Sequence, residues 1–169
     1  MTETWPERLS EHWSFQEAIH SSRAEELGLE NQPPLELLPN ALRIASLAED
    51  LRAGLALHYG REIPLQTTSG YRCLRLNAVV GGSGAHPGEK MSAHTRFLAF
   101  DLIPYGIELE ETFQVARTLG LAFDKLILET DGHATWLHLQ ASAPRAAPRR
   151  LVFRGHKGLS GSTFQPVTA

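Results

Sequence analysis

Apolar residues recur at steps of three and four between residues 35 and 58, which is the strongest periodic signal in the chain. The series consists of Leu38, Leu42, Ala45, Ala48, Leu51 and Leu55. This spacing places the apolar side chains on one face, so it predicts a long amphipathic helix that follows Pro33-Pro34 and ends at Tyr59-Gly60. A second series predicts a shorter amphipathic helix over residues 108–119, with Gly120 as its cap.

Short apolar runs between turn residues predict the strands of a small sheet. The runs cover residues 63–67, 97–103, 125–129 and 135–140, and residues 151–153 form a candidate edge strand. Asp131-Gly132 separates two of the runs and predicts a hairpin turn. Short helices are expected over residues 22–28 and 74–80. The pattern predicts an α+β fold in which a small, mainly antiparallel sheet packs against helices.

The length of the chain, 169 residues, suits one domain with a real core. We expect an irregular N-terminus over residues 1–12, a single domain over residues 13–154 and a flexible tail over residues 155–169. The sequence has no internal repeat and no signal for a second domain.

Composition is that of an ordinary soluble globular protein, and the net charge of −3 gives no argument for nucleic-acid binding. Residues 141–169 nevertheless hold five basic residues and no acidic one, which leaves −8 for the rest of the chain. This segment either attracts an anionic polymer or is a solvated edge strand with a tail, and we favour the second interpretation. Cys73 is the only cysteine, so an internal disulfide and a cysteine-based zinc cluster are both excluded.

The N-terminus lacks the basic and apolar regions of a signal peptide, and no run approaches the roughly 18 apolar residues of a membrane helix. We therefore expect a protein without a membrane span that is synthesised in the cytoplasm, and we favour a monomer.

An aspartate at the end of an apolar run is the most informative feature of the sequence. Asp101 follows Phe97-Leu98-Ala99-Phe100, and burial of its charge without a partner would be costly. His94 precedes it by seven residues, and His138 lies in the later apolar stretch 135–140. Two histidines and an aspartate are good zinc ligands, and three protein ligands leave a position for water, as in catalytic zinc sites. The bland alternative is a loop histidine, a turn-forming aspartate and a strand histidine with no common role.

Several short motifs occur in an order and spacing that resemble a known family. They are Ser69-Gly70-Tyr71-Arg72, Leu76-Asn77, Val80-Gly81-Gly82, Ser92-x-His94, Ala99-x-Asp101 and Trp136-x-His138. Over residues 12–142 the chain resembles the zinc-dependent peptidoglycan peptidases of the D-Ala-D-Ala carboxypeptidase and L-Ala-D-Glu endopeptidase type, and in particular the small forms found as phage endolysins and in prophages.

The resemblance implies a zinc ion held by His94, Asp101 and His138, and hydrolysis of a peptide bond in peptidoglycan stem peptides or cross-links. Arg72 would hold a substrate carbonyl or carboxylate, for which a guanidinium offers paired donors. Substrate would also contact Tyr71, Ser92 and Trp136, which line the groove in this interpretation.

The general base remains open between two residues. A hairpin loop of two or four residues places Glu129 on the same face of the sheet as His138, whereas a loop of three or five residues reverses this. The resemblance adds His133, because some family members use a histidine five residues before the last zinc ligand. We favour Glu129.

Three departures from the family pattern bear on activity. Phe97 stands where the family has glycine, so the groove is expected to differ. The loop before His94 is longer and brings in His86, and Thr135 replaces an acidic residue that some members carry. The alternatives to an active peptidase are therefore an inactive zinc- or wall-binding module and a virion-associated wall-penetration protein. An active lysin would reach the cell wall after assisted release.

Overall fold

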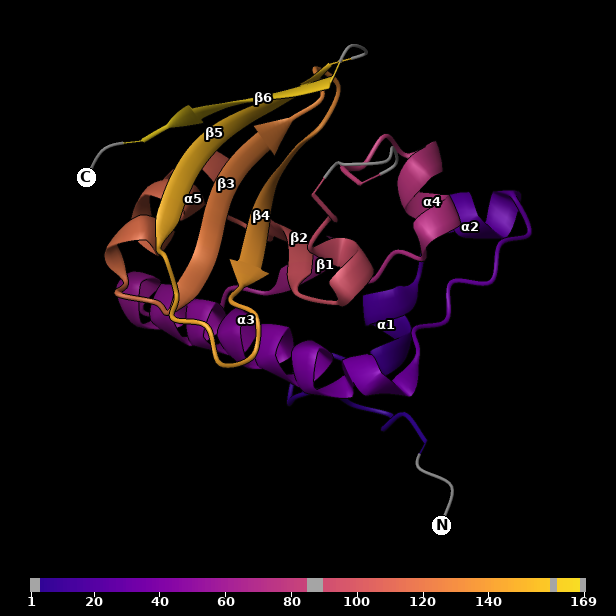
Figure 1. Ribbon diagram of the computed structural model, residues 1–169. Coiled ribbons are helices and arrows are strands. Elements are labelled where there is room, and N and C mark those ends of the chain that lie inside the picture. Colours follow the sequence, from indigo (N-terminus) through magenta and orange to yellow (C-terminus); the bar gives the residue numbers. More distant parts are fainter. Residues whose placement is uncertain (1–3, 85–89, 159–160, 168–169) are drawn as a thin grey trace.

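The apolar runs of the sequence form one sheet in the computed structural model, which describes residues 4–84, 90–158 and 161–167 (Figure 1). Its six described strands are β1 Leu65–Ser69, β2 Ala99–Pro104, β3 Phe123–Thr130, β4 Thr135–Ala141, β5 Leu151–Gly158 and β6 Gly161–Pro166. They lie in the order β1-β2-β4-β3-β5-β6, and every neighbouring pair is antiparallel except β3 with β5. The predicted α+β class with a mainly antiparallel sheet is confirmed.

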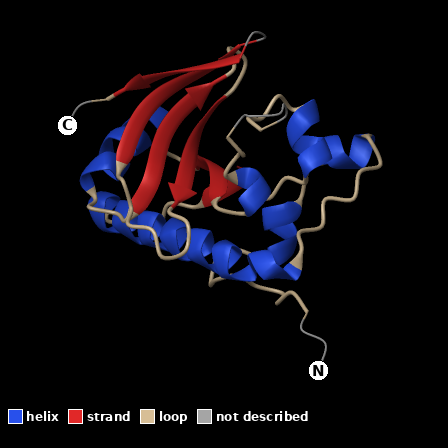
Figure 2. Cartoon of the chain, in the orientation of Figure 1, coloured by secondary structure: helices blue, strands red, loops and turns tan. Residues whose placement is uncertain are grey.

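Two helices, α3 Leu38–Tyr59 and α5 Leu109–Thr118, cover one side of this sheet (Figure 2). The shorter helices α1 Phe15–Ile19, α2 Ser22–Glu26 and α4 Leu74–Val79 lie near the β1 end of the sheet, and two 3-10 turns span Leu35–Leu37 and His94–Arg96. The periodic series of the sequence correctly predicts α3 and α5, although Leu42 is exposed. Among the described residues, no helix is both long and apolar enough to cross a membrane.

Alternation along the central strands separates the core from the opposite face. Leu137 and Leu139 of β4 belong to the main apolar cluster, together with residues of α3 and α5. Successive side chains of a strand point to opposite faces, so His138 lies on the other side of the sheet. Asp101 is paired with His138 across β2 and β4, and cross-strand partners share a face. The polar residues of interest therefore gather on the face away from α3 and α5.

The C-terminal segment corrects one prediction. A flexible tail was expected from residue 155, but β5 continues to Gly158 and residues 161–166 form β6, which pairs with β5 along its whole length. Without β6, β5 would present a row of unpaired backbone groups to solvent. Packing of the Phe153 and Phe164 rings also ties the two strands together. The predicted tail is therefore wrong for the described residues of this segment.

A second correction concerns the start of β2. The strand was expected from Phe97, but Phe97 has a φ of 54° and ends the 3-10 turn that carries His94, and β2 begins at Ala99. Its ring is fully buried against the rings of Trp5, Tyr71 and Phe100. The left-handed backbone explains why glycine suits this position. Phe97 fills the core and is not among the residues that line the groove described below, so any effect of this residue on the groove would be indirect.

Candidate metal centre

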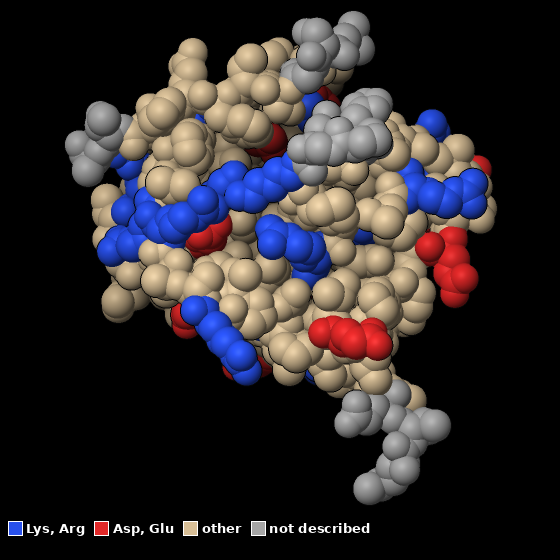
Figure 3. Space-filling view, viewed as in Figure 1, with Lys and Arg blue, Asp and Glu red and all other residues tan. Residues whose placement is uncertain are grey.

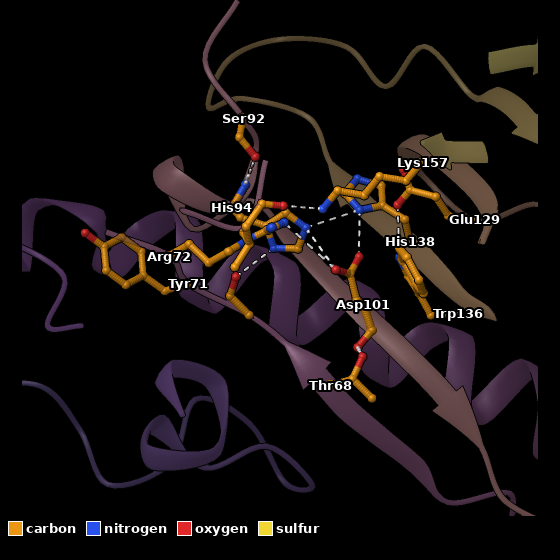
Figure 4. A network of polar contacts seen from close by, with 12 residues as sticks. Thr68, Tyr71, Arg72, Ser92, His94, Asp101, Glu129, Trp136, His138 and Lys157 are labelled. Atoms are coloured by element: carbon orange, nitrogen blue, oxygen red, sulfur yellow. Dashed lines mark hydrogen bonds and ion pairs between the residues drawn. The ribbon is translucent and has the colours of Figure 1, made fainter. Parts of the chain in front are cut away.

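Three elements bring the predicted metal ligands together. Asp101 lies in β2 directly between Ser69 of β1 and His138 of β4, and His94 lies in the 3-10 turn that precedes β2. One ligand atom from each of His94, Asp101 and His138 falls within 4.8 Å of the others, and all three side chains are buried. Figure 4 shows the three side chains converging on one point.

His94, Asp101 and His138 are called the metal trio below, and the distances between their ligand atoms fit a bound cation. His94 Nε2 lies 3.3 Å from His138 Nδ1 and 3.4 Å from Asp101 Oδ2, and His138 Nδ1 lies 2.8 Å from Asp101 Oδ1. A tetrahedral zinc ion with metal–nitrogen bonds of about 2.0–2.1 Å separates its ligand atoms by roughly 3.3 Å. Two of the three separations already have that length.

The tautomer of His94 supports the same interpretation. Its Nδ1 lies 2.7 Å from the backbone carbonyl oxygen of Gly70, which can only accept, so Nδ1 carries the hydrogen. Nε2 then has a bare lone pair that faces Asp101 Oδ2, also an acceptor. Two buried acceptors that face each other repel, and a metal cation between them would remove this repulsion.

Gly70 also explains part of the Ser-Gly-Tyr-Arg motif. A Cβ atom at this position would lie 2.1 Å from the backbone oxygen of Ala18, so α1 approaches too closely for any side chain. The backbone nitrogen of Tyr71 donates to the same Ala18 oxygen at 2.8 Å. This contact fixes the turn whose carbonyl orients His94.

Protonation states at neutral pH also favour metal binding. Burial, followed by the charge of Arg72, lowers the pKa of His94 to about 4. Burial raises the pKa of Asp101, but interactions with His94 and His138 outweigh it and hold that pKa well below its usual value. His94 is therefore neutral and Asp101 is charged, as a metal ligand requires.

Arg72 borders the trio without joining it. Its Nη2 lies 3.9 Å from Asp101 Oδ2, and its Nε is buried and has no hydrogen-bond partner in the described structure. Burial lowers the pKa of Arg72, and the charges of Asp101 and Glu129 oppose that effect. A buried guanidinium with donors to spare fits the predicted role of holding a substrate oxygen.

The β3–β4 hairpin decides which candidate base faces the site. Thr130 pairs with Thr135, so four residues form the loop and Glu129 lies opposite Trp136. Glu129 and His138 therefore share a face, and Glu129 Oε2 accepts a hydrogen bond of 2.9 Å from Trp136 Nε1. His133 lies in the exposed turn, where its backbone nitrogen donates to Asp131 Oδ1. The geometry favours Glu129 over His133.

The other predicted substrate contacts have different positions. Trp136 is half-buried and orients Glu129 through the bond just described. Ser92 is buried and accepts a hydrogen bond from the His94 backbone nitrogen, so it holds the 3-10 turn. Tyr71 is only 7% exposed, and its ring packs on Phe97 as part of the core rather than along a groove. His86 lies outside the described residues.

A groove of about 450 Å³ runs from the trio towards β1 and α2. It is lined by residues 20–23, residues 66–69, Arg72, Leu76, Val80 and Asp101. Asp101 and Arg72 thus form the inner end of an open channel. A peptide bound in this channel would therefore reach Asp101 and Arg72.

Sequence reasoning missed two residues of this region. Asn31 donates to the backbone oxygens of Ile19 and Tyr71 and accepts from the Cys73 nitrogen, so it clamps the turn that carries Arg72. The sequence marks Asn31 only as part of a chain break before two prolines. Lys157 reaches the site from β5, and its position within the predicted tail hid it.

Comparison with known proteins agrees with this geometry. The Peptidase M15 family model matches residues 11–140, which include all three residues of the trio. No curated protein matches the chain. The resemblance inferred from the sequence motifs is confirmed at the level of the family. The chain therefore belongs to the Peptidase M15 family, the zinc peptidases of the D-Ala-D-Ala carboxypeptidase type.

Proposed function

We propose that this protein hydrolyses a peptide bond in peptidoglycan stem peptides or cross-links, with a zinc ion held by His94, Asp101 and His138. One observation carries the proposal. In a member of a metallopeptidase family, ligand atoms of three buried side chains lie within 4.8 Å of one another beside a groove of about 450 Å³. Family membership supports a metallopeptidase that acts on peptidoglycan, and the choice of bond is part of the proposal.

Each residue has a distinct role in this proposal. A zinc ion bound by the trio would lower the pKa of a water molecule towards about 7 and polarise the substrate carbonyl. Glu129 takes the proton of the attacking water and passes it to the leaving amine, because it is the carboxylate on the His138 face of the hairpin. Arg72 donates to the substrate oxygen, and Trp136 keeps the Glu129 carboxylate in position.

Digestion of purified cell walls tests the proposal. The zinc-loaded protein is incubated with peptidoglycan between pH 6 and 9, and the released muropeptides are identified by mass spectrometry. We expect new amino termini or shortened stems from the wild type, and none from His94→Ala or Glu129→Gln. The absence of any cleaved bond in zinc-loaded wild type would contradict the proposal. The cleaved bond is read directly from the masses.

The alternative, an inactive module, rested on Phe97 and Thr135. Phe97 lies in the core and is not among the residues that line the groove, which weakens one of these two arguments. The second argument was that Thr135 replaces an acidic residue. Thr135 has no carboxylate, but Glu129 offers one on the same face of the sheet as His138. Cleavage by the wild type decides between the two functions.

We further propose that the enzyme serves as a phage or prophage lysin that reaches the wall after assisted release. The resemblance to small endolysins supports this role. Fractionation of washed virions tests it, because a lysin of this kind should be absent from the particles, whereas a virion-associated protein should remain bound to them.

A further inference from the structure

The β5–β6 hairpin lies beyond the residues that match the family, yet it contacts the proposed catalytic residues. β5 runs parallel to β3, and Gly155 lies directly opposite Glu129. A Cβ atom at Gly155 would meet the Phe164 ring at 3.0 Å and Glu129 Cγ at 3.2 Å, so the glycine leaves room for the Glu129 side chain. Lys157 is two residues further along the strand and shares that face. The hairpin is thus a wall of the site.

The Lys157 side chain crosses the site from β5 to the far rim of the groove. Its Nζ donates a hydrogen bond of 2.6 Å to the backbone oxygen of Val80, a residue that lines the groove. Figure 4 shows the side chain extending over the trio towards Arg72. The ammonium group therefore lies where a peptide in the groove would pass.

The charge of Lys157 is unbalanced by any direct partner. Among the described residues, no carboxylate forms a salt bridge with it. The side chain is half-buried, and burial followed by the charge of Arg72 lowers its pKa. The charges of Glu129, Asp101 and Asp131 oppose that effect, but none of these carboxylates forms an ion pair with Lys157, so a further anion could bind between Lys157 and Arg72.

We propose that Lys157 is a substrate-binding residue that, together with Arg72, holds a free carboxylate of an acidic peptide beside the metal trio. This inference rests on the proposed function, since it defines the class of substrate for the same groove. Arg72 contacts the inner end of the groove and Lys157 the rim, so a carboxylate between them would be fixed on both sides. A peptide amidated at that carboxylate would lose both charge-assisted bonds.

Two of the other basic residues in this segment form ion pairs within the protein. Arg149 pairs with Asp124, and Arg154 pairs with Glu110. Figure 3 shows lysine and arginine side chains in a band across this view, interrupted by acidic groups. A specific carboxylate therefore explains Lys157 better than a general attraction to an anionic polymer does, because Arg149 and Arg154 are neutralised within the protein and Lys157 points into the site.

A matched set of peptides and variants tests the inference. The probes are the stem pentapeptide L-Ala-γ-D-Glu-L-Lys-D-Ala-D-Ala, which has two free carboxylates, and two amidated forms, one at the C-terminal carboxylate and one at the α-carboxylate of D-Glu. Affinities are measured by calorimetry on the zinc-loaded full chain in a Glu129→Gln background, which slows hydrolysis. The variants are Lys157→Gln, which still donates a hydrogen bond, and Lys157→Arg, which keeps the charge. Lys125→Gln is the control, because Lys125 is a half-buried lysine on the neighbouring strand.

We expect Lys157→Gln to weaken binding of the acidic pentapeptide about 10- to 100-fold, as for the loss of a bond between charged groups. For one of the two amidated peptides, Lys157→Gln should change the affinity less than about twofold, and that peptide identifies the carboxylate. Lys157→Arg should restore most of the affinity, and Lys125→Gln should bind like its parent. Thermal melting of each variant checks that the hairpin remains folded.

Three results would overturn the inference: equal weakening for acidic and amidated peptides, no effect of Lys157→Gln, or no binding of the pentapeptide at all. Equal weakening of binding for the acidic and amidated peptides would mean that Lys157 has only a structural role, in which it joins the β5–β6 hairpin to Val80. The proposed function is judged separately, by cleavage with a wild-type Glu129. A protein that binds the acid through Lys157 but cuts no bond would refute the peptidase, and one that cuts with an unchanged KM in Lys157→Gln would refute the carboxylate contact.

Discussion

Two buried aspartates of the same sheet have opposite surroundings. Asp101 and Asp124 are 7% and 6% exposed, and each faces a residue of β4. Arg149 donates to Asp124 through Nε at 2.7 Å and Nη2 at 2.6 Å, and Gln140 adds a third bond at 2.8 Å. Asp101 instead faces two histidines, and its nearest arginine, Arg72, is 3.9 Å away.

The difference separates a structural carboxylate from a functional one. The Asp124 carboxylate accepts all three of its hydrogen bonds from Arg149 and Gln140, and the charge of Arg149 neutralises it. Around Asp101, His94 presents a bare lone pair, and the only close hydrogen is the one on His138. Burial and charge are the same for both groups, so the direction of the neighbouring lone pairs is what indicates a metal site.

The largest expected effect comes from the same substitution at the two aspartates. Asp101→Asn should abolish zinc binding and lower kcat/KM by about 10⁴-fold or more, since both the ion and the water that it activates are lost. Asp124→Asn should retain one zinc per chain and kcat/KM within about threefold, because it touches none of the ligands. Metal content and peptide release are measured on the same samples. Equal losses in both variants would remove the distinction.

Replacement of the proposed base, Glu129, should lower activity without loss of the metal. Glu129→Gln should lower kcat by about 10²- to 10⁴-fold while zinc stays bound, because proton transfer is lost and the ligands are intact. His133→Gln, in the exposed turn, serves as the control and should remain near wild type. A large loss in His133→Gln with normal Glu129→Gln would assign the base to the histidine instead.

On the structural side, loss of the arginine should affect stability alone. Arg149→Met leaves Asp124 buried with only Gln140 as a partner, and we expect the free energy of unfolding to fall by about 1–3 kcal/mol. Arg154→Met breaks an exposed pair with Glu110 and should cost less than about 1 kcal/mol. Urea unfolding measures both. Cleavage activity that falls with Arg149→Met would place Asp124 in the functional group after all.

The smallest effect is the pH dependence of that ion pair. Hydrogen bonds from Arg149 outweigh burial and lower the pKa of Asp124 below the usual 3.8. A carboxyl with a lowered pKa stabilises the fold above the unfolded-state pKa, and the contribution disappears as the pH falls through the folded-state pKa. The stability gap between wild type and Arg149→Met should therefore be constant from about pH 7 to 5 and narrow below about pH 4. A gap that does not change with pH would show that packing, not charge, holds Arg149.

The sequence predicts those parts of the molecule that depend on local periodicity. α3 and α5 follow from their apolar series, and the metal trio follows from a charged residue in an apolar run together with the motif order. The side of the sheet on which Glu129 lies also depends on one local feature, the number of residues in the β3–β4 loop. Once that loop has four residues, the period of two along the strand determines the rest.

Features that depend on tertiary contacts could not be predicted in this way. Phe97 adopts a left-handed backbone because burial of its ring offsets the strain, and no local pattern reports that balance. Strand β6 exists because the edge of β5 accepts it. Asn31 binds the backbone of Cys73, and Lys157 binds the backbone of Val80. Both partners are distant in the sequence, so no local pattern predicts these contacts.

Zinc titration followed by thermal unfolding tests the central claim most directly. One equivalent of zinc should raise the melting temperature of the metal-free wild type, because an ion that binds the native state stabilises it. The shift should vanish in His138→Ala and persist in Arg149→Met, which alters the other aspartate cluster. An equal shift in wild type and His138→Ala, with the same bound metal, would contradict the assignment of His94, Asp101 and His138 as the metal centre.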